Sequence, residues 1–336
     1  HDCYVSHKVN TLRWLGDSDC FVTGSWDEPI YTQWKWGNEN KPQGNKLCFW
    51  KLGLDHSSSL DLPECTGTIL HNGDVMDMAY MHGPGYGRII TASSTGEVTA
   101  FFQEENGNIK SFGLEKGHNG PATVVEVVRD QSSDSVVSAG EDGKVILYSL
   151  KEQKMIDSWK CGRSITSMKL QGDANQVFTS NTSGNLRFWD TRESKKAQTK
   201  VRCDGSGAIH SIDIHPSRPL LVATGNEDGS ICIWDLRNYK DHLCRYKQHQ
   251  SSIWKIQFHP TVPDYLLSAG DDGDLLLWDF HSPSSIHTQY GGKERLSVHR
   301  LLHSPLSLNT FDVHREYNIL IAGSDNEVLH TINLSR

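Results

Sequence analysis

Three carboxylates crowd into one short stretch of the sequence, GDDGDLLLWD at 270–279. Asp271, Asp272 and Asp274 fall within four residues and are followed by four apolar residues in a row. Carboxylates so spaced can bind a divalent cation, serve as a general acid–base pair, or accept hydrogen bonds from the backbone of a tight turn. A metal site needs further ligands from other parts of the chain, and a catalytic pair needs a feature found at one place only. The rest of the chain therefore shows which of the three roles applies.

The same frame recurs along the chain. Each of its seven copies has an aliphatic residue two positions after its origin, and six have an aromatic residue five positions after it. The origins are Asn45, Gly96, Gly143, Gly184, Gly229, Gly273 and Glu327. Each copy follows a short apolar run that ends in small residues. Two apolar runs joined by a tight turn predict a β-hairpin.

Two more strands complete each repeat. An upstream run carries apolar residues at its first, fourth and sixth positions, as in Ile253, Ile256 and Phe258. A more polar stretch between repeats, such as 154–160 or 197–203, suits an exposed outer strand. Four strands in each of seven repeats predict an all-β protein, a single seven-bladed β-propeller domain over 1–336 with no amphipathic helix.

The seventh repeat ends after its third strand, and residues 2–7 precede the first repeat. We therefore expect residues 2–7 to supply the missing outer strand and to close the ring.

Composition excludes several classes of function. The net charge is -8, and the basic residues form no run that would bind nucleic acid. No apolar stretch approaches the roughly 18 residues of a membrane span, and the eight scattered cysteines without a C-x-x-C pair indicate reduced intracellular thiols. No phosphate loop, nucleophile elbow or zinc-helix motif occurs, so we expect no enzyme, cofactor, metal or small-molecule substrate.

The turn residues resemble those of the WD-repeat family. In that family a turn Asp, a Ser or Thr on the second strand, a Trp on the third and an upstream His form a buried hydrogen-bonded set. His249, Ser268, Asp272 and Trp278 occupy all four places, whereas Thr224, Asp228 and Trp234, like His118, Ser138 and Asp142, occupy three. The acidic cluster is therefore interpreted as a turn, with Asp271 and Asp274 as solvated residues beside it. His299 and His303 have the i, i+4 spacing of a zinc pair on a helix, but without Cys partners they are expected to be solvated or capping residues in a loop.

Two segments are longer than the blades require. Residues 25–46 replace the first turn and carry Tyr31, Trp34 and Trp36, either packed on the blade flank or exposed on an arm that binds a partner. Residues 281–307 are expected to form a long surface loop. Trp254 stands where the other repeats carry residues such as Asn10 or Thr123, and either packs between blades or lies at the channel mouth.

Six segments, among them GSWD at 24–27, HNGDVMDM at 71–78 and SLNTFDV at 307–313, resemble the WD-repeat nucleoporins of the Y-shaped outer-ring complex of the nuclear pore. The resemblance implies a scaffold at the nuclear envelope, docked on a helical nucleoporin of the short arm of that complex. It also implies a place at kinetochores in mitosis.

A rival interpretation is a substrate receptor of a cullin-type ubiquitin ligase. The segments 189–192 and 234–237 read W-D-x-R and resemble the paired adaptor-docking motif of that group, with Arg192 and Arg237 as the contact residues. The Trp-Asp pair belongs to the repeat itself, and an Arg at a strand end can simply pair with a neighbouring acid.

Overall fold

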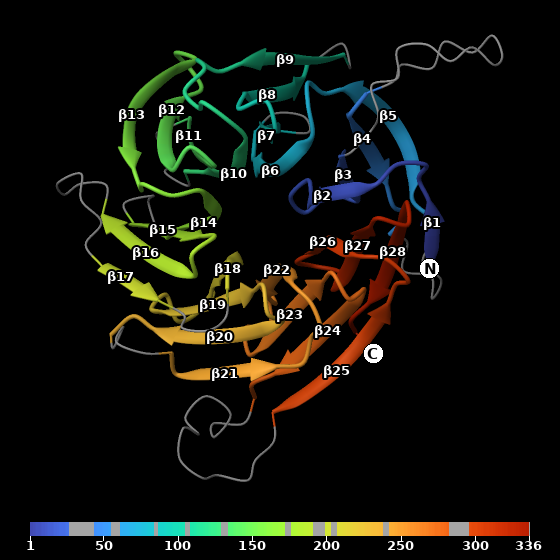
Figure 1. The fold of residues 1–336 in the computed structure, drawn as a ribbon. Coiled ribbons are helices and arrows are strands. Elements are labelled where there is room, and N and C mark those ends of the chain that lie inside the picture. Colours follow the sequence, from blue (N-terminus) through green and yellow to red (C-terminus); the bar gives the residue numbers. More distant parts are fainter. Residues whose placement is uncertain are drawn as a thin grey trace, which may run out of the picture.

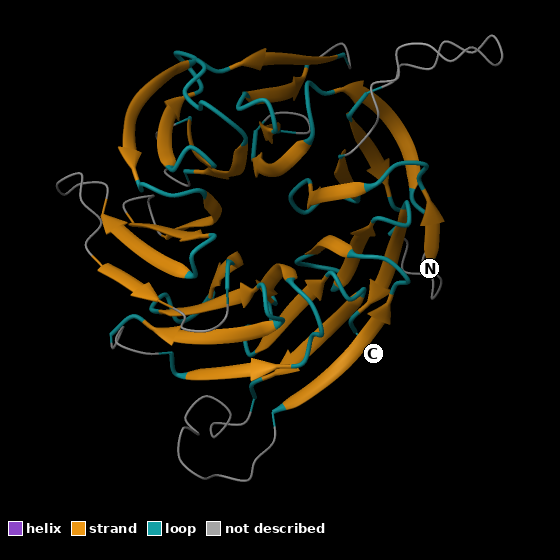
Figure 2. Cartoon of the chain, in the orientation of Figure 1, coloured by secondary structure: helices purple, strands orange, loops and turns teal. Residues whose placement is uncertain are grey.

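Seven β-sheets of four strands each are arranged in a ring, and we call the space inside their innermost strands the channel (Figure 1). This computed structural model describes residues 1–26, 44–54, 61–83, 87–104, 108–128, 134–171, 176–190, 199–202, 207–237, 242–281 and 296–335. The described residues form 28 strands and no helix, so none of them belongs to a helix that could cross a membrane (Figure 2). The all-β class and the seven blades are as predicted.

In blades 1 to 6 the strands follow the chain order from the channel outward, and in blade 7 β1 takes the outermost place. Blade 1 comprises β2 (Val9–Trp14), β3 (Cys20–Ser25), β4 (Lys46–Lys51) and β5 (Glu64–Leu70); blade 2 β6 (Val75–Met81), β7 (Arg88–Ser93), β8 (Val98–Gln103) and β9 (Ile109–Gly113); blade 3 β10 (Ala122–Val127), β11 (Ser135–Gly140), β12 (Lys144–Ser149) and β13 (Lys154–Lys160). Blade 4 comprises β14 (Ile165–Gln171), β15 (Gln176–Asn181), β16 (Asn185–Asp190) and β17 (Thr199–Arg202); blade 5 β18 (Ile209–Ile214), β19 (Leu221–Asn226), β20 (Ser230–Asp235) and β21 (Cys244–Lys247). Blade 6 comprises β22 (Ile253–Phe258), β23 (Tyr265–Gly270), β24 (Asp274–Asp279) and β25 (Ser297–His303); blade 7 β26 (Leu308–Val313), β27 (Ile319–Ser324), β28 (Val328–Asn333) and β1 (Asp2–Tyr4).

The N-terminal strand closes the ring. β1 pairs antiparallel with β28, with Cys3 opposite Leu329, and Val5 N–H donates to the Glu327 carbonyl at 2.8 Å. Strands from the two ends of the chain therefore complete one sheet, which confirms the predicted closure.

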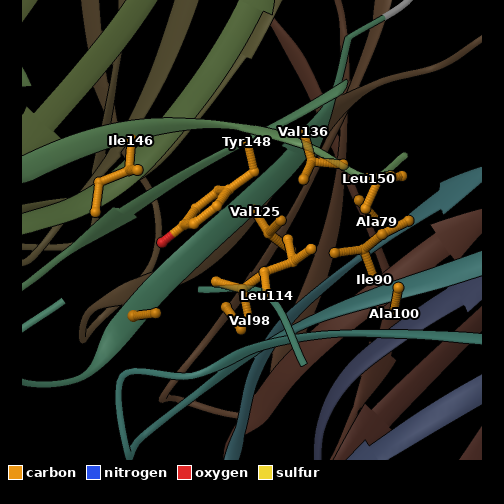
Figure 3. Close-up of a cluster of buried hydrophobic side chains, with 12 residues drawn as sticks. Ala79, Ile90, Val98, Ala100, Leu114, Val125, Val136, Ile146, Tyr148 and Leu150 are labelled. Atoms are coloured by element: carbon orange, nitrogen blue, oxygen red, sulfur yellow. The ribbon is translucent and has the colours of Figure 1, made fainter. Parts of the chain in front are cut away.

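The hydrophobic core lies between neighbouring blades. Second strands such as β11 and β19 are buried at every residue, because both faces of each sheet pack on another sheet. Figure 3 shows one such layer, in which Ala79, Ile90 and Val98 of blade 2 meet Val125, Ile146 and Tyr148 of blade 3. The outer strands are more exposed than the second strands, and most residues of β13 face solvent at least in part.

Every innermost strand carries a β-bulge at its second residue. The register shifts there in all seven blades, at Asn10, Met76, Thr123, Thr166, His210, Trp254 and Asn309. A bulge adds an unpaired residue and re-aims its side chain. These seven side chains therefore share one position around the ring.

The two long segments have different outcomes. Ser25 ends β3 and Lys46 begins β4, whereas most of the segment between them, with Tyr31, Trp34 and Trp36, lies outside the described residues. The prediction of a loop through 281–307 is wrong in part, since Ser297–His303 forms β25, the outer strand of blade 6. His299 and His303 therefore lie on a strand. Its polar sequence lacks the apolar alternation that would have marked it.

Deleting residues 1–7 should lower the melting temperature by roughly 5 °C or more. The deletion removes the β1–β28 pairing and the burial of Val5, worth about 4 kcal/mol together. Thermal unfolding followed by circular dichroism measures the shift. Tyr4→Ala is the control, because Tyr4 is exposed and its replacement keeps the backbone pairs. Equal melting temperatures for the deletion and the intact chain would refute closure by β1.

Candidate interaction surface

The tight turn of blade 6 holds one connected hydrogen-bond chain. Asp272 accepts from Nδ1 of His249 at 2.9 Å, Nε2 of His249 lies 2.7 Å from the Ser268 hydroxyl, and Trp278 Nε1 donates to that hydroxyl at 2.8 Å. An indole N–H can only donate, so the Ser268 oxygen accepts from Trp278 and is bonded to His249 as well. The chain joins the connection between two blades to the second and third strands of blade 6.

The Asp272 carboxylate also closes its own turn. It accepts the N–H groups of Gln250 and Asp274 at 2.8 and 3.2 Å. Burial by itself would raise the pKa of Asp272, but the bonds from His249 and the backbone outweigh burial and hold the pKa below its usual value. The carboxylate is thus a structural hydrogen-bond acceptor.

Asp274, expected to be solvated, is instead buried. It pairs with Arg300 at 3.0 Å and with His303 at 2.8 Å, both on β25. Because β25 was not recognised as a strand, its two basic side chains could not be placed beside Asp274. Asp271 is exposed, as expected.

Other blades keep parts of this hydrogen-bond chain. In blade 3, His118 bonds Asp142 at 3.0 Å and Ser138 at 2.7 Å. Burial lowers the pKa of His118 more than Asp142 raises it, so the ring is neutral at pH 7. In blade 5, Trp234 donates to Thr224 at 3.1 Å.

In blade 5 the turn Asp228 pairs instead with Arg245 of the outer strand β21. Two further bonds escaped the sequence analysis, from Trp50 to Thr23 and between His71 and Thr91, each at 2.9 Å. The four residues occupy the equivalent positions of the repeat, so an alignment of the repeats would have predicted both bonds.

A ring of charge lines the channel, and the sequence analysis missed it entirely. It consists of three basic and four acidic side chains from the innermost strands. They are Arg13, Asp77, Glu126, Lys169, Asp213, Lys255 and Asp312. Arg13 pairs with Asp77 at 3.0 Å, and Lys169 pairs with Glu126 at 2.8 Å.

The channel acids also bind backbone. Asp77 accepts from Val125 N–H at 3.2 Å, Asp213 from Phe258 N–H at 2.7 Å and Asp312 from Trp14 N–H at 3.0 Å. Each bond runs from one blade to the innermost strand of another. These strands are sheet edges with unpaired N–H groups, so the carboxylates fasten blade to blade.

Lys255 is the exception in the ring. Among the described residues no carboxylate lies within ion-pair distance of its ammonium group. Burial, with Arg13 and Lys169 adding repulsion, lowers the pKa of Lys255 to about 8 despite Asp77 and Asp312.

The structure places some of the candidate binding residues and leaves others undescribed. Trp254 is 38% exposed, so it does not pack fully between blades. Arg237 is exposed and forms an ion pair with Asp235 at 2.5 Å, the pairing that a strand-end Arg is expected to make. Arg192 lies outside the described residues. Among the described side chains, no group of three or more His, Cys, Asp or Glu residues could hold a metal ion.

Ser268→Ala should destabilise the protein by about 2–4 kcal/mol, because it leaves Trp278 Nε1 and His249 Nε2 buried without a partner. Chemical denaturation measures the free energy of unfolding. Ser268→Thr is the matched control: it keeps the hydroxyl, and blade 5 has Thr224 at the equivalent place. A Ser268→Ala protein within about 0.5 kcal/mol of the parent would contradict the hydrogen-bond chain.

Lys255→Met should stabilise the protein by about 1–2 kcal/mol at pH 7. The folded-state pKa lies below the unfolded value, so the charged ammonium destabilises the fold below pH 8. This cost fades as the pH rises toward 10.5. Denaturation at pH 7 and at pH 10 measures the effect, with Lys169→Met as a control that should destabilise because it leaves Glu126 unpaired. A loss of stability in Lys255→Met would show that its charge is compensated.

Known proteins match this architecture. The EIPR1 beta-propeller family model matches residues 51–278. The chain is 29% identical over 275 residues to nucleoporin Nup43 of Mus musculus, and 28% identical over 278 residues to nucleoporin Nup43 of Homo sapiens, in each case over 75% of this chain and 68% of the relative. It is 27% identical to the nuclear pore complex protein NUP43 of Arabidopsis thaliana over 164 residues, 44% of each chain.

The family match covers blades 2 to 5 completely and reaches the third strand of blade 6. The similarity to the two Nup43 proteins extends over three quarters of the chain. The chain belongs to the EIPR1 beta-propeller family and is a WD-repeat propeller similar to nucleoporin Nup43.

Proposed function

We propose that this protein is a non-enzymatic scaffold of the nuclear pore. The observation that carries the proposal is its similarity to Nup43 proteins of two animals over 75% of the chain. More finely, it would belong to the Y-shaped outer-ring complex and dock on a helical nucleoporin of the short arm. In this role it supports transport of proteins and mRNA between nucleus and cytoplasm, with a second place at kinetochores in mitosis.

The geometry supports a scaffold. Carboxylates and imidazoles that could do chemistry are held in structural bonds, as Asp272 and His249 are in the turn and Asp213 is in the channel. Bonds from blade to blade and a strand-closed ring make a stiff body with broad faces. Such a body presents surfaces to other proteins.

The docking experiment uses the whole chain. Mixed with a reconstituted short arm of the Y-complex, it should co-elute stoichiometrically on size exclusion. Replacing Tyr31, Trp34 and Trp36 together by Ala tests the aromatic segment that the sequence singled out, and truncation of such anchors typically costs about 2 kcal/mol or more. Tyr4→Ala is the matched control, an exposed aromatic residue on the outer strand of blade 7.

Separate elution at micromolar concentrations would overturn short-arm docking. Binding instead to the ubiquitin-ligase adaptor, lost in an Arg192→Ala and Arg237→Ala double variant, would replace the scaffold by the receptor interpretation. Retained binding in the triple aromatic variant would move the docking surface away from residues 25–46.

A further inference from the structure

The bulged residue of each innermost strand usually links one blade to the next. Asn10 donates to the Val75 carbonyl at 2.8 Å, Thr123 to Ile165 at 2.8 Å and Asn309 to Val9 at 3.0 Å, and Thr166 donates likewise to Ile209. Four short polar side chains therefore share one structural task at the channel rim.

Blades 2, 5 and 6 depart from this pattern, with Met76, His210 and Trp254 at the bulge. Of the three, blade 6 carries the largest side chain. Its bulged residue is Trp254, whose ring packs against the bulged His210 of blade 5 with centroids 4.7 Å apart and planes at 51°. The indole stays 38% exposed. A strand bulge fixes its backbone, so a large aromatic surface is presented to solvent at little further cost in conformational entropy, as in many interface hot spots.

Two acids flank this aromatic pair. We call the side of the ring that carries the tight turns and the connections between blades the upper face. On it, Ser252 donates to the Glu227 carbonyl at 3.1 Å and accepts from Asp271 N–H at 2.8 Å, so both exposed acids lie beside the connection that leads into Trp254. Ala208 N–H donates to Glu227 Oε2 at 2.8 Å, and this carboxylate is close enough to His210 to act on the pKa of its ring.

The surroundings are acidic over three blades. The turns of blades 5, 6 and 7 carry six carboxylates: Glu227, Asp228, Asp271, Asp272, Asp325 and Glu327. The described connections 207–208, 248–252 and 304–307 contain no Lys or Arg, whereas the connection 5–8, which also borders the turn of blade 7, carries Lys8 over the Trp26 ring.

Each of these six carboxylates accepts a bond within the fold: Asp228 from Arg245, Asp272 from His249, Asp325 from Trp26, Glu327 from Tyr4, Asp271 from the Ser251 hydroxyl at 2.9 Å and Glu227 from Ala208 N–H. Burial lowers the pKa of His210 more than Glu227 raises it, so at pH 7 this ring is neutral and does not offset the acids. Glu227 and Asp271 are the exposed acids of this set, and both lie beside the connection that leads into Trp254.

We propose that Trp254, with His210, Glu227 and Asp271, docks a basic segment of a partner protein, with an arginine or lysine head over the indole and between the two carboxylates. Charge complementarity selects this occupant, because an acidic face around an aromatic ring attracts cations and repels acidic chains. The site is independent of the nuclear pore assignment, since it follows from this chain's own surface.

The test uses the full chain and a defined probe. A nine-residue peptide of alternating leucine and arginine between Gly-Ser ends is titrated into protein labelled at its 10 tryptophan indoles, with a citrulline peptide of the same shape as the uncharged counterpart. Each labelled indole N–H gives one NMR signal, and the signal that is absent from the spectrum of the Trp254→Phe variant is assigned to Trp254. We expect that signal to shift with the arginine peptide and to stay in place with the citrulline peptide.

Variants then locate the site. Trp254→Ala and Glu227→Gln should each weaken binding roughly three- to tenfold. Glu141→Gln should leave it unchanged: Glu141 is the equivalent exposed turn acid of blade 3, and its N–H bonds the Pro121 carbonyl as that of Glu227 bonds Ala208. Equal melting temperatures exclude misfolding. Absence of a shift at millimolar peptide, or equal losses in Glu227→Gln and Glu141→Gln, would overturn the proposal, the latter by showing attraction to net charge alone.

Discussion

Seven sheet edges face one another across a channel, and their unpaired backbone groups must find partners. The innermost strand of each blade pairs on one side only, so its remaining N–H and carbonyl groups look toward the next blade. Side chains from neighbouring innermost strands satisfy many of them. Asp213 and Asp312 accept N–H groups, and Asn10 and Asn309 donate to carbonyls. The ring is held by this exchange as well as by its apolar layers.

The same exchange explains why the channel is charged. Carboxylates are strong acceptors for backbone N–H groups, and burying several of them together calls for nearby cations. Arg13 and Lys169 supply these through direct ion pairs. Lys255 sits among the same charges without such a pair, and its lowered pKa reflects that imbalance. Charge in the channel is therefore a consequence of architecture, and it needs no ligand to account for it.

Positions that depart from the repeat pattern are the ones available to contact a partner protein. A residue that follows the pattern, such as Asn10 or Asp272, is occupied by bonds within the fold. Trp254 follows neither the size nor the bonding of its counterparts, and it stands on the acidic side of the upper face. A scaffold with sevenfold regularity gains specificity through such departures, because equivalent sites would bind a partner in seven orientations.

The sequence by itself determined the blade number, the hairpins and the closure by residues 2–7, because turn glycines, buried runs and the aromatic residue of the third strand repeat at short range. It also indicated the turn bonds of His249, Ser268 and Trp278, whose places follow from that repeat. Only the tertiary structure decided the charged channel, the ion pairs of Asp274 with β25 and the exposure of Trp254. Arg13 and Asp77 are 64 residues apart, and no local pattern records that two blades bring them within 3.0 Å. Local periodicity encodes strands, whereas contacts between blades form only when separate sheets pack against one another.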